Sequence, residues 1–215
     1  MTNEFLRTSK GKNDECYTPR YGVEPLLEFM ELFEQRFMAP VEFSSKTLTS
    51  PLLSSDSPCG ETPPSETPLR RPVIWCPFDT QDSEYVKVFK ENGFTVVYSH
   101  IKYGQDFYNY EPEKWDVIIS NPPFTGKTKI FERALSFKKP FALLMTITWL
   151  NDATPAKTFG KEQLQILSFD ERMEFKNRSK EKQINFMSAY FCHNFLPRDF
   201  IFRSLKENNK QLKLL

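Results

Sequence analysis

The stretch with the clearest chemical potential is the pentapeptide Ser-Asn-Pro-Pro-Phe at 120–124, which follows an apolar run and precedes a segment with helical character. The side-chain carbonyl of Asn121 and the backbone carbonyl of Pro122 can accept two hydrogen bonds from one amino group, and Pro123 stiffens the turn. Phe124 offers a flat face on which a base can stack. These residues could hold an exocyclic amine while it attacks an electrophilic methyl group, with positioning and electrostatics in place of a strong base.

Two other interpretations of this loop compete with amine chemistry. Residues 121–128 end in Gly-Lys-Thr and could suggest a phosphate loop, but Asn121 stands where that loop needs glycine. Pro122 and Pro123 also lack the backbone N–H groups that would bind phosphate. An ordinary strand-to-helix turn explains each residue singly, but it explains the full set poorly.

Composition narrows the class of protein. The chain has 215 residues, 29 Lys and Arg against 28 Asp and Glu, and a net charge of +1, which argues against a mainly electrostatic nucleic-acid binder. The four cysteines form no Cys-x-x-Cys pair and there are only two histidines, so we expect no metal site. No long apolar run and no signal-peptide pattern occur, so we expect a cytoplasmic protein without membrane attachment.

Short apolar runs alternate with helical segments over most of the chain, which predicts parallel βαβ units in one α/β domain over 1–215. A stretch rich in Ser, Thr and Pro, at about 42–72, is expected to be a flexible insertion. The expected helices cover 23–37, 82–93 and 129–139, the expected sheet strands cover 72–78, 94–101, 115–120 and 140–150, and a closing antiparallel pair covers 172–177 and 186–195. In such a sheet, ligands bind beyond the carboxyl ends of the strands, which points to 76–79, 99–101, 104–107 and 121–124.

The pentapeptide after its apolar strand resembles the catalytic motif Asp/Asn/Ser-Pro-Pro-Tyr/Phe/Trp of the S-adenosylmethionine-dependent amino methyltransferases, specifically the adenine-N6 class of bacteria and phages. The resemblance implies a Rossmann-like methyltransferase fold and methyl transfer from S-adenosylmethionine to the N6 amine of adenine in DNA. It implies that Asn121 and the Pro122 carbonyl hold the amine, that Pro123 completes the motif, and that Phe124 stacks on a base flipped out of the duplex.

Three further stretches are similar to the cofactor motifs of this family. Residues 16–29, with their Thr-Pro pair before a helix, resemble the N-terminal motif that helps to hold the methionine end, 75–79 stand at the first strand-to-loop transition, and 104–107 resemble the acidic-aromatic motif that meets the adenine. The cofactor-binding residues that the resemblance implies are Tyr17, Thr18, Pro19, Pro77, Phe78, Asp79, Ser99, Asp106, Phe107 and Asn121.

Two features depart from the family pattern. The loop at 76–83 has no glycine, whereas the family's cofactor loop is usually glycine-rich, and the second strand ends in Ser-His-Ile instead of an acid that binds the ribose. Asp79 or Asp82 could take the place of that acid. A catalytically impaired binding protein with the same fold therefore stays open as an alternative.

The sequence contains no separate DNA-recognition domain that we can identify. The basic segment within 174–186 suggests a DNA-contacting hairpin, although a solvated loop is the ordinary alternative, and the expected nucleic-acid contacts are Lys127, Lys176, Arg178, Lys180 and Lys182. Specificity could come from a separate partner, and RNA, single-stranded DNA or protein glutamine are alternative substrates. A nucleotidyltransferase is a further alternative, with Asp79, Asp82 and Glu84 as its only hint of a metal-binding carboxylate cluster. The sequence predicts no particular oligomeric state.

Overall fold

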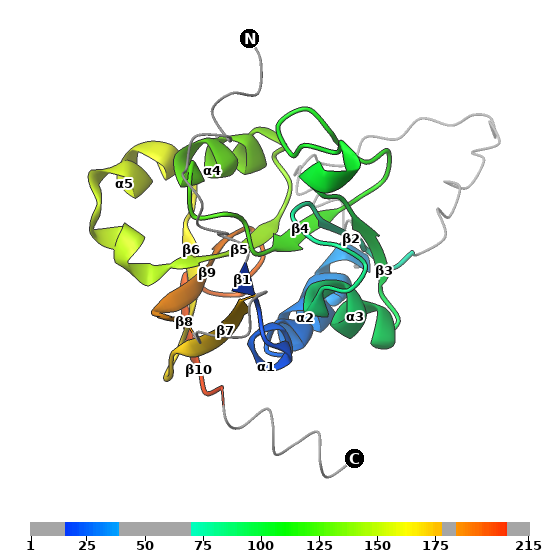
Figure 1. Cartoon of the computed structure of the whole chain (residues 1–215), viewed down its shortest axis with the longest axis horizontal. Coiled ribbons are helices and arrows are strands. Elements are labelled where there is room, and N and C mark those ends of the chain that lie inside the picture. Colours follow the sequence, from blue (N-terminus) through cyan, green and yellow to red (C-terminus); the bar gives the residue numbers. More distant parts are fainter. Residues whose placement is uncertain (1–15, 39–69, 178–183, 206–215) are drawn as a thin grey trace, which may run out of the picture.

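A twisted, mostly parallel sheet forms the centre of the molecule (Figure 1). The structure is a computed structural model that describes residues 16–38, 70–177 and 184–205. In these residues seven strands join the main sheet in the order β10-β6-β9-β5-β4-β2-β3, and only β9 runs antiparallel to the others. The strands are β2 (Val73–Cys76), β3 (Thr95–Tyr98), β4 (Val117–Ser120), β5 (Phe141–Thr146), β6 (Gln165–Phe169), β9 (Ser188–His193) and β10 (Phe200–Arg203).

Helices cover both faces of this sheet, with α1, α2 and α3 on one side and α4 and α5 on the other (Figure 1). Strands β4, β5, β6 and β9 are almost wholly buried, as expected for strands with helices on both faces. Each face has its own aromatic-rich core, one around Phe89 of α3 and the other around Phe131 of α4. The helices are α1 (Arg20–Val23), α2 (Leu26–Met38), α3 (Glu84–Glu91), α4 (Lys127–Ser136) and α5 (Ala153–Phe159), with 3-10 turns η1 (Ile101–Tyr103) and η2 (Ile147–Asn151).

Local sequence signals account for the helix ends beside the sheet. Ser83 is the N-cap of α3 and its hydroxyl accepts a hydrogen bond from the Tyr85 backbone N–H at 3.2 Å. After α3, Gly93 adopts a left-handed φ of 78°, which lets the chain turn directly into β3. Gly126 has a φ of 75° at the N-cap of α4, so a residue with a Cβ would be strained at this junction.

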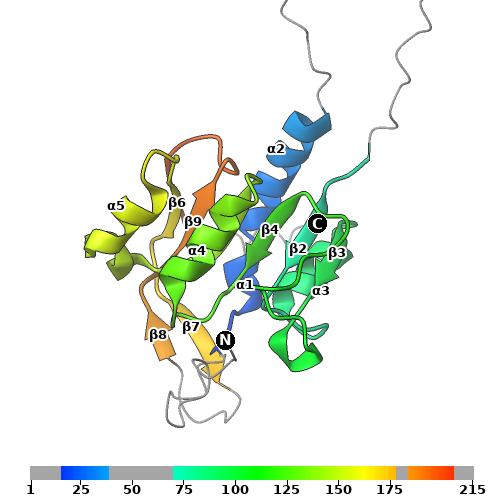
Figure 2. The ribbon, with the colours of Figure 1, turned by 90° about the horizontal axis from the view of Figure 1, so that it is seen from above.

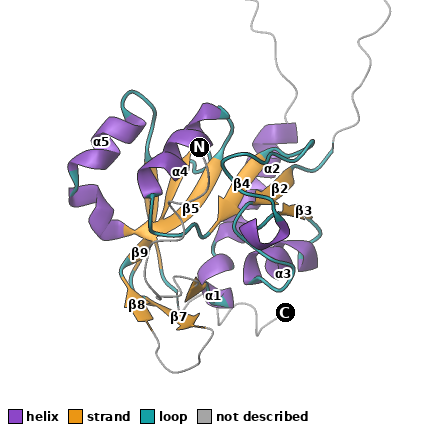
Figure 3. Cartoon of the chain, turned by 45° about the horizontal axis from the view of Figure 1, so that its top comes forward, coloured by secondary structure: helices purple, strands orange, loops and turns teal. Residues whose placement is uncertain are grey.

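A second, small sheet lies beside the main one (Figure 3). It consists of β1 (Cys16–Tyr17), β7 (Met173–Asn177) and β8 (Ile184–Phe186), in the order β1-β7-β8 with antiparallel pairing. The strand expected at 186–195 is therefore divided, since β8 ends at Phe186 and pairs with β7, whereas β9 begins at Ser188 and enters the main sheet between β5 and β6. The division follows from burial, because Met187 is exposed whereas every residue of β9 is buried.

The expected α/β fold is confirmed: the chain has a Rossmann-like arrangement, with one antiparallel strand inside an otherwise parallel sheet. Helix α5 and strands β6 and β10 were not predicted from the sequence, and the strand that was predicted to reach residue 150 ends at Thr146. Most of the insertion expected at about 42–72 lies outside the described residues, and the single-domain assignment over 1–215 stays a prediction. No helix among the described residues has the length and apolar character that a membrane crossing requires.

Candidate active site at the carboxyl edge of the sheet

The strand order reverses between β2 and β4. From β2 the chain continues to β3 on one side, whereas β4 pairs with the other side of β2. The helices that follow these strands lie on opposite faces, α3 in one core and α4 in the other, and Figure 2 shows α4 alongside β4. A doubly wound sheet binds its ligands at such a reversal, outside the carboxyl ends of the strands. The loops at 77–83 and 121–126 leave the sheet at this point.

The Asn-Pro-Pro-Phe loop starts directly at the end of β4. Asn121 is half-buried, Pro122 is buried, and Phe124 is half-buried with its ring packed against the core around α4. The loop closes at Gly126, where an added Cβ would lie 3.6 Å from the Tyr108 hydroxyl. The motif is therefore held by core packing at both ends: Phe124 keeps part of its surface exposed, and Asn121 is half-buried with its side-chain oxygen Oδ1 buried.

Asp79 connects the loop after β2 to the strand that carries this motif. Its carboxylate is buried, with 8% of the residue exposed, and accepts a hydrogen bond from the Ser83 hydroxyl at 2.5 Å and another from the Ser120 hydroxyl at 2.5 Å. Burial raises the pKa of Asp79 to about 6, although the two hydrogen bonds favour the charged form and oppose that shift. Ser120 is the residue before Asn121, so the two loops at the reversal are joined through one carboxylate.

The N-terminal segment that was predicted to bind the cofactor is tied to α3 by buried hydroxyl groups. The Tyr190 hydroxyl donates to the Gly22 carbonyl at 2.8 Å, so its contact of 2.8 Å with Tyr85 has Tyr85 as donor. Thr18 is buried like both tyrosines. Burial raises the pKa of Tyr85 and of Tyr190 above the ordinary tyrosine range, and both phenols therefore stay protonated donors.

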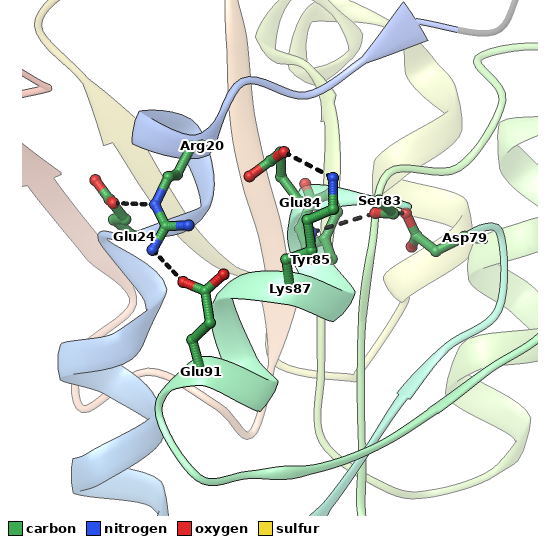
Figure 4. Close-up of polar contacts among 8 residues, drawn as sticks. All are labelled: Arg20, Glu24, Asp79, Ser83, Glu84, Tyr85, Lys87 and Glu91. Atoms are coloured by element: carbon green, nitrogen blue, oxygen red, sulfur yellow. Dashed lines mark hydrogen bonds and ion pairs between the residues drawn. The ribbon is translucent and has the colours of Figure 1, made fainter. Parts of the chain in front are cut away.

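Charged groups at the surface connect the same elements (Figure 4). Arg20 of α1 donates to Glu24 at 2.8 Å and to Glu91 at the end of α3 at 2.6 Å. Hydrogen bonding to Arg20 lowers the pKa of Glu91. Of the predicted N-terminal residues, Tyr17 is 40% exposed and Pro19 is the N-cap of α1, so this segment reaches the surface next to α3.

Ser99 is engaged inside the protein. It is fully buried, and its hydroxyl accepts a hydrogen bond from the Trp75 indole N–H at 3.0 Å. The next residue, His100, caps η1 by accepting a hydrogen bond from the Lys102 backbone N–H at 3.1 Å. The end of β3 thus presents no side-chain carboxylate, and the Ser99 hydroxyl donates inward to the backbone carbonyl of Pro77 at 3.5 Å.

The acidic-aromatic segment divides between the core and the surface. Phe107 is 2% exposed and packs against Trp75 and Phe78, with a ring separation of 4.9 Å to Phe78. Asp106 is half-buried and accepts a hydrogen bond from the Tyr108 backbone N–H at 3.1 Å. The half-buried rings of Phe78 and Tyr108, and not that of Phe107, therefore form the accessible aromatic surface here. Pro77, which precedes Phe78, is buried.

The predicted nucleic-acid contacts are only partly described. Lys127 begins α4, where its ammonium group lies 3.3 Å from the Asp152 carboxylate and over the Trp149 ring. Lys176 lies in β7 opposite Tyr17, but the structure does not describe its side chain. The other three predicted contacts lie outside the described residues: Arg178, Lys180 and Lys182. In the described ranges no group of three or more His, Cys, Asp or Glu side chains could hold a metal ion.

The hydroxyl groups that join these segments were not predicted from the sequence. Ser83 carried a recognisable signal, since it directly precedes a helix as an N-cap should, and Ser120 is part of the quoted motif. Tyr85 and Tyr190 looked like ordinary core residues. The sequence gives no sign that a tyrosine of helix α3 and a tyrosine of strand β9, 105 positions apart, form a hydrogen bond.

Comparison with known proteins gave distant matches among solved structures. No family model matches the chain, and no curated protein matches it significantly. Among solved structures, one match is described as a modification subunit of a putative type I restriction enzyme from Vibrio vulnificus YJ016, with 12% identity and a TM-score of 0.44. The match covers 93% of this chain and 49% of the other, so this chain spans about half the length of that protein. A predicted O-methyltransferase from Agrobacterium tumefaciens is 14% identical with a TM-score of 0.27, over 60% of this chain and 66% of the other.

Proposed function

We propose that the protein transfers a methyl group from S-adenosylmethionine to the N6 amine of adenine in DNA. The observation that carries this proposal is the position of the Asn-Pro-Pro-Phe loop at the carboxyl end of β4, beside the strand reversal, where Asn121 and Phe124 are half-buried and the side-chain oxygen of Asn121 is itself buried. A loop placed there faces the region where a doubly wound sheet binds its ligands. The motif combines two carbonyl acceptors and an aromatic face, which together match a planar amine.

The protein residues act by holding the amine. The Asn121 side-chain carbonyl and the Pro122 backbone carbonyl accept one N–H hydrogen each, while Phe124 stacks on the base. This arrangement keeps the nitrogen lone pair directed at the methyl group. S-adenosylmethionine carries that methyl group on a sulfonium, and the sulfur becomes a neutral thioether when the methyl group is transferred. The nitrogen–carbon bond forms as the carbon–sulfur bond breaks, and the extra proton on nitrogen passes to water. Positioning of this kind can supply most of the acceleration that a strong base would otherwise have to give.

The residues around the reversal fit S-adenosylmethionine through their aromatic rings. Phe78 and Tyr108 offer half-buried rings that suit the adenine. Thr18 and the adjoining residues Tyr17 and Pro19 would meet the methionine end, and Asp106 would lie near the adenine.

The setting that we propose is the cytoplasm of a bacterial cell, either uninfected or infected by a phage. Lys127 and the basic segment that includes Lys176 would contact the DNA backbone, whose phosphates attract lysine and arginine. With so little surface for reading bases, target specificity would be short, or a separate partner would supply it.

The test is methyl transfer from labelled S-adenosylmethionine to unmethylated duplex DNA, with base analysis of the product. Asn121→Ala should lose about two to three orders of magnitude in rate, as expected when one positioning or charge-stabilising group is removed, while cofactor binding by calorimetry is kept. Asn109→Ala, at an exposed asparagine of the neighbouring loop, is the matched control and should keep the parent rate.

Other results would redirect or end the proposal. Equal labelling by the parent and Asn121→Ala would refute the role of this loop. Label on RNA or on a protein glutamine, with none on DNA, would replace the substrate. Cofactor binding without transfer to any of them would favour the catalytically impaired alternative.

A further inference from the structure

Asp79 is an unusual group for the place that it occupies. It is buried at the junction of two loops, and its hydrogen-bond partners are two neutral hydroxyl groups. Among the described Lys, Arg and His side chains, none forms an ion pair with it. A buried carboxylate without a cationic partner costs stability. An unpaired acid at this point therefore needs an explanation other than folding.

Capping of α3 does not supply that explanation. Ser83 already accepts the Tyr85 backbone N–H with its own oxygen, so the helix end needs no further acceptor. What Asp79 adds is a link across the reversal, because its second oxygen binds Ser120 on β4, 41 positions along the chain. Hydrogen bonds to an ionised acceptor are about twice as strong as those between neutral groups, so the charge makes this link firmer.

We infer that Asp79 is a positioning residue: its carboxylate clamps the loop after β2, through Ser83, to the end of β4, through Ser120, and so fixes Asn121 relative to the cofactor loop. The inference rests on the proposed function and adds to it a group that touches neither substrate nor the transferred methyl. The clamp joins the side of the reversal that would hold the cofactor to the side that would hold the target amine. Methyl transfer needs the two in line, and a misplacement of about 1 Å can cost about a hundredfold in rate.

Hydrogen exchange, read peptide by peptide on the full chain without ligands, tests the clamp directly. Ser120→Ala removes the link to β4 and keeps the charge, whereas Asp79→Asn keeps the shape and removes the charge. Both should speed exchange in the peptides that cover 77–83 and 118–124, by about tenfold for a lost bond worth about 1.4 kcal/mol. Their effects on global unfolding should be opposite, since Asp79→Asn also relieves a buried charge. Gln81→Ala, at an exposed residue of the same loop, is the control and should leave exchange unchanged.

A second readout separates positioning from simple structural support. In the transfer assay both variants should lower kcat by about tenfold to a hundredfold, while the Kd of the non-reactive analogue sinefungin changes by less than about threefold. Unchanged exchange in the two peptides would overturn the clamp, and an unchanged kcat in an active protein would overturn its positioning role. If both variants exchange faster than the parent in the two peptides, but the parent methylates no DNA, the clamp is upheld and the proposed function is refuted.

Discussion

Replacing Asp79 with Asn should make the protein more stable at neutral pH. Burial raises the pKa of Asp79 from an ordinary value of 3.8 to about 6, so the folded state holds this proton more tightly than the unfolded state does. Between these two values, stability falls as pH rises, because unfolding lets the acid ionise in water. The difference of about two pKa units corresponds to about 3 kcal/mol once the group is fully ionised in both states.

Urea unfolding of the parent and of Asp79→Asn, from pH 4 to pH 8, measures this contribution as a difference between the two proteins. The neighbouring titratable groups Cys76, Tyr85 and Tyr190 have pKa values raised by burial, so they stay protonated over this range and do not confuse the comparison. The advantage of the variant should grow from near zero at pH 4 to about 3 kcal/mol above pH 7.

The matched control is Glu113→Gln, which removes an exposed carboxylate and should give no comparable change with pH. A difference between parent and Asp79→Asn that stays constant from pH 4 to pH 8 would mean that Asp79 ionises normally. A variant that grows less stable relative to the parent as pH rises would refute the reasoning altogether, since the charge would then be stabilising.

Two further predictions concern the buried polar groups around the site. Tyr190→Phe removes the donor to Gly22 and the acceptor for Tyr85. The free energy of unfolding, measured by urea titration, should therefore fall by about 1–3 kcal/mol. A loss below about 0.5 kcal/mol would mean that these hydroxyl groups contribute little to stability. Ser99→Ala leaves the buried Trp75 indole N–H without its acceptor. It should lower the free energy of unfolding by a similar amount, which is measured as a lower midpoint of thermal unfolding. Ser99→Thr keeps the hydroxyl and should recover part of this loss if the added methyl group is accommodated.

The sequence was sufficient for the parts of the fold that repeat a simple pattern. The apolar runs that became β2, β3, β4 and β5 alternate with amphipathic helices, and this alternation predicts parallel strands. Strand β6 was missed because the polar residues Gln165 and Ser168 interrupt its short apolar run, Gln-Ile-Leu-Ser-Phe, although all five residues are buried in the sheet between β9 and β10. Gln165 is a polar residue in that strand whose amide is satisfied by the backbone of Phe195 and Leu196, which no local pattern reveals.

The candidate site was predictable to the extent that its residues are adjacent in sequence. Asn121 to Phe124 form one motif, and its place after a strand could be read directly. The link from Asp79 to Ser120 and the inward direction of Ser99 depend on contacts between residues that lie 41 and 24 positions apart. Phe107 looked suited to a ligand but packs into the core, because burial of an aromatic ring is decided by the neighbouring rings and not by the motif around it.

The antiparallel strand β9 has a consequence for how the chain reaches its native state. β9 separates β5 from β6, so these strands cannot join one sheet until the residues up to His193 have been synthesised. Until then the edge of β5 presents unpaired backbone groups beside a strongly apolar surface, which is a template for association with other chains. Contacts between residues so distant in sequence also slow folding. A nascent chain of this protein should therefore be most prone to aggregation during synthesis of the segment from β6 to β9.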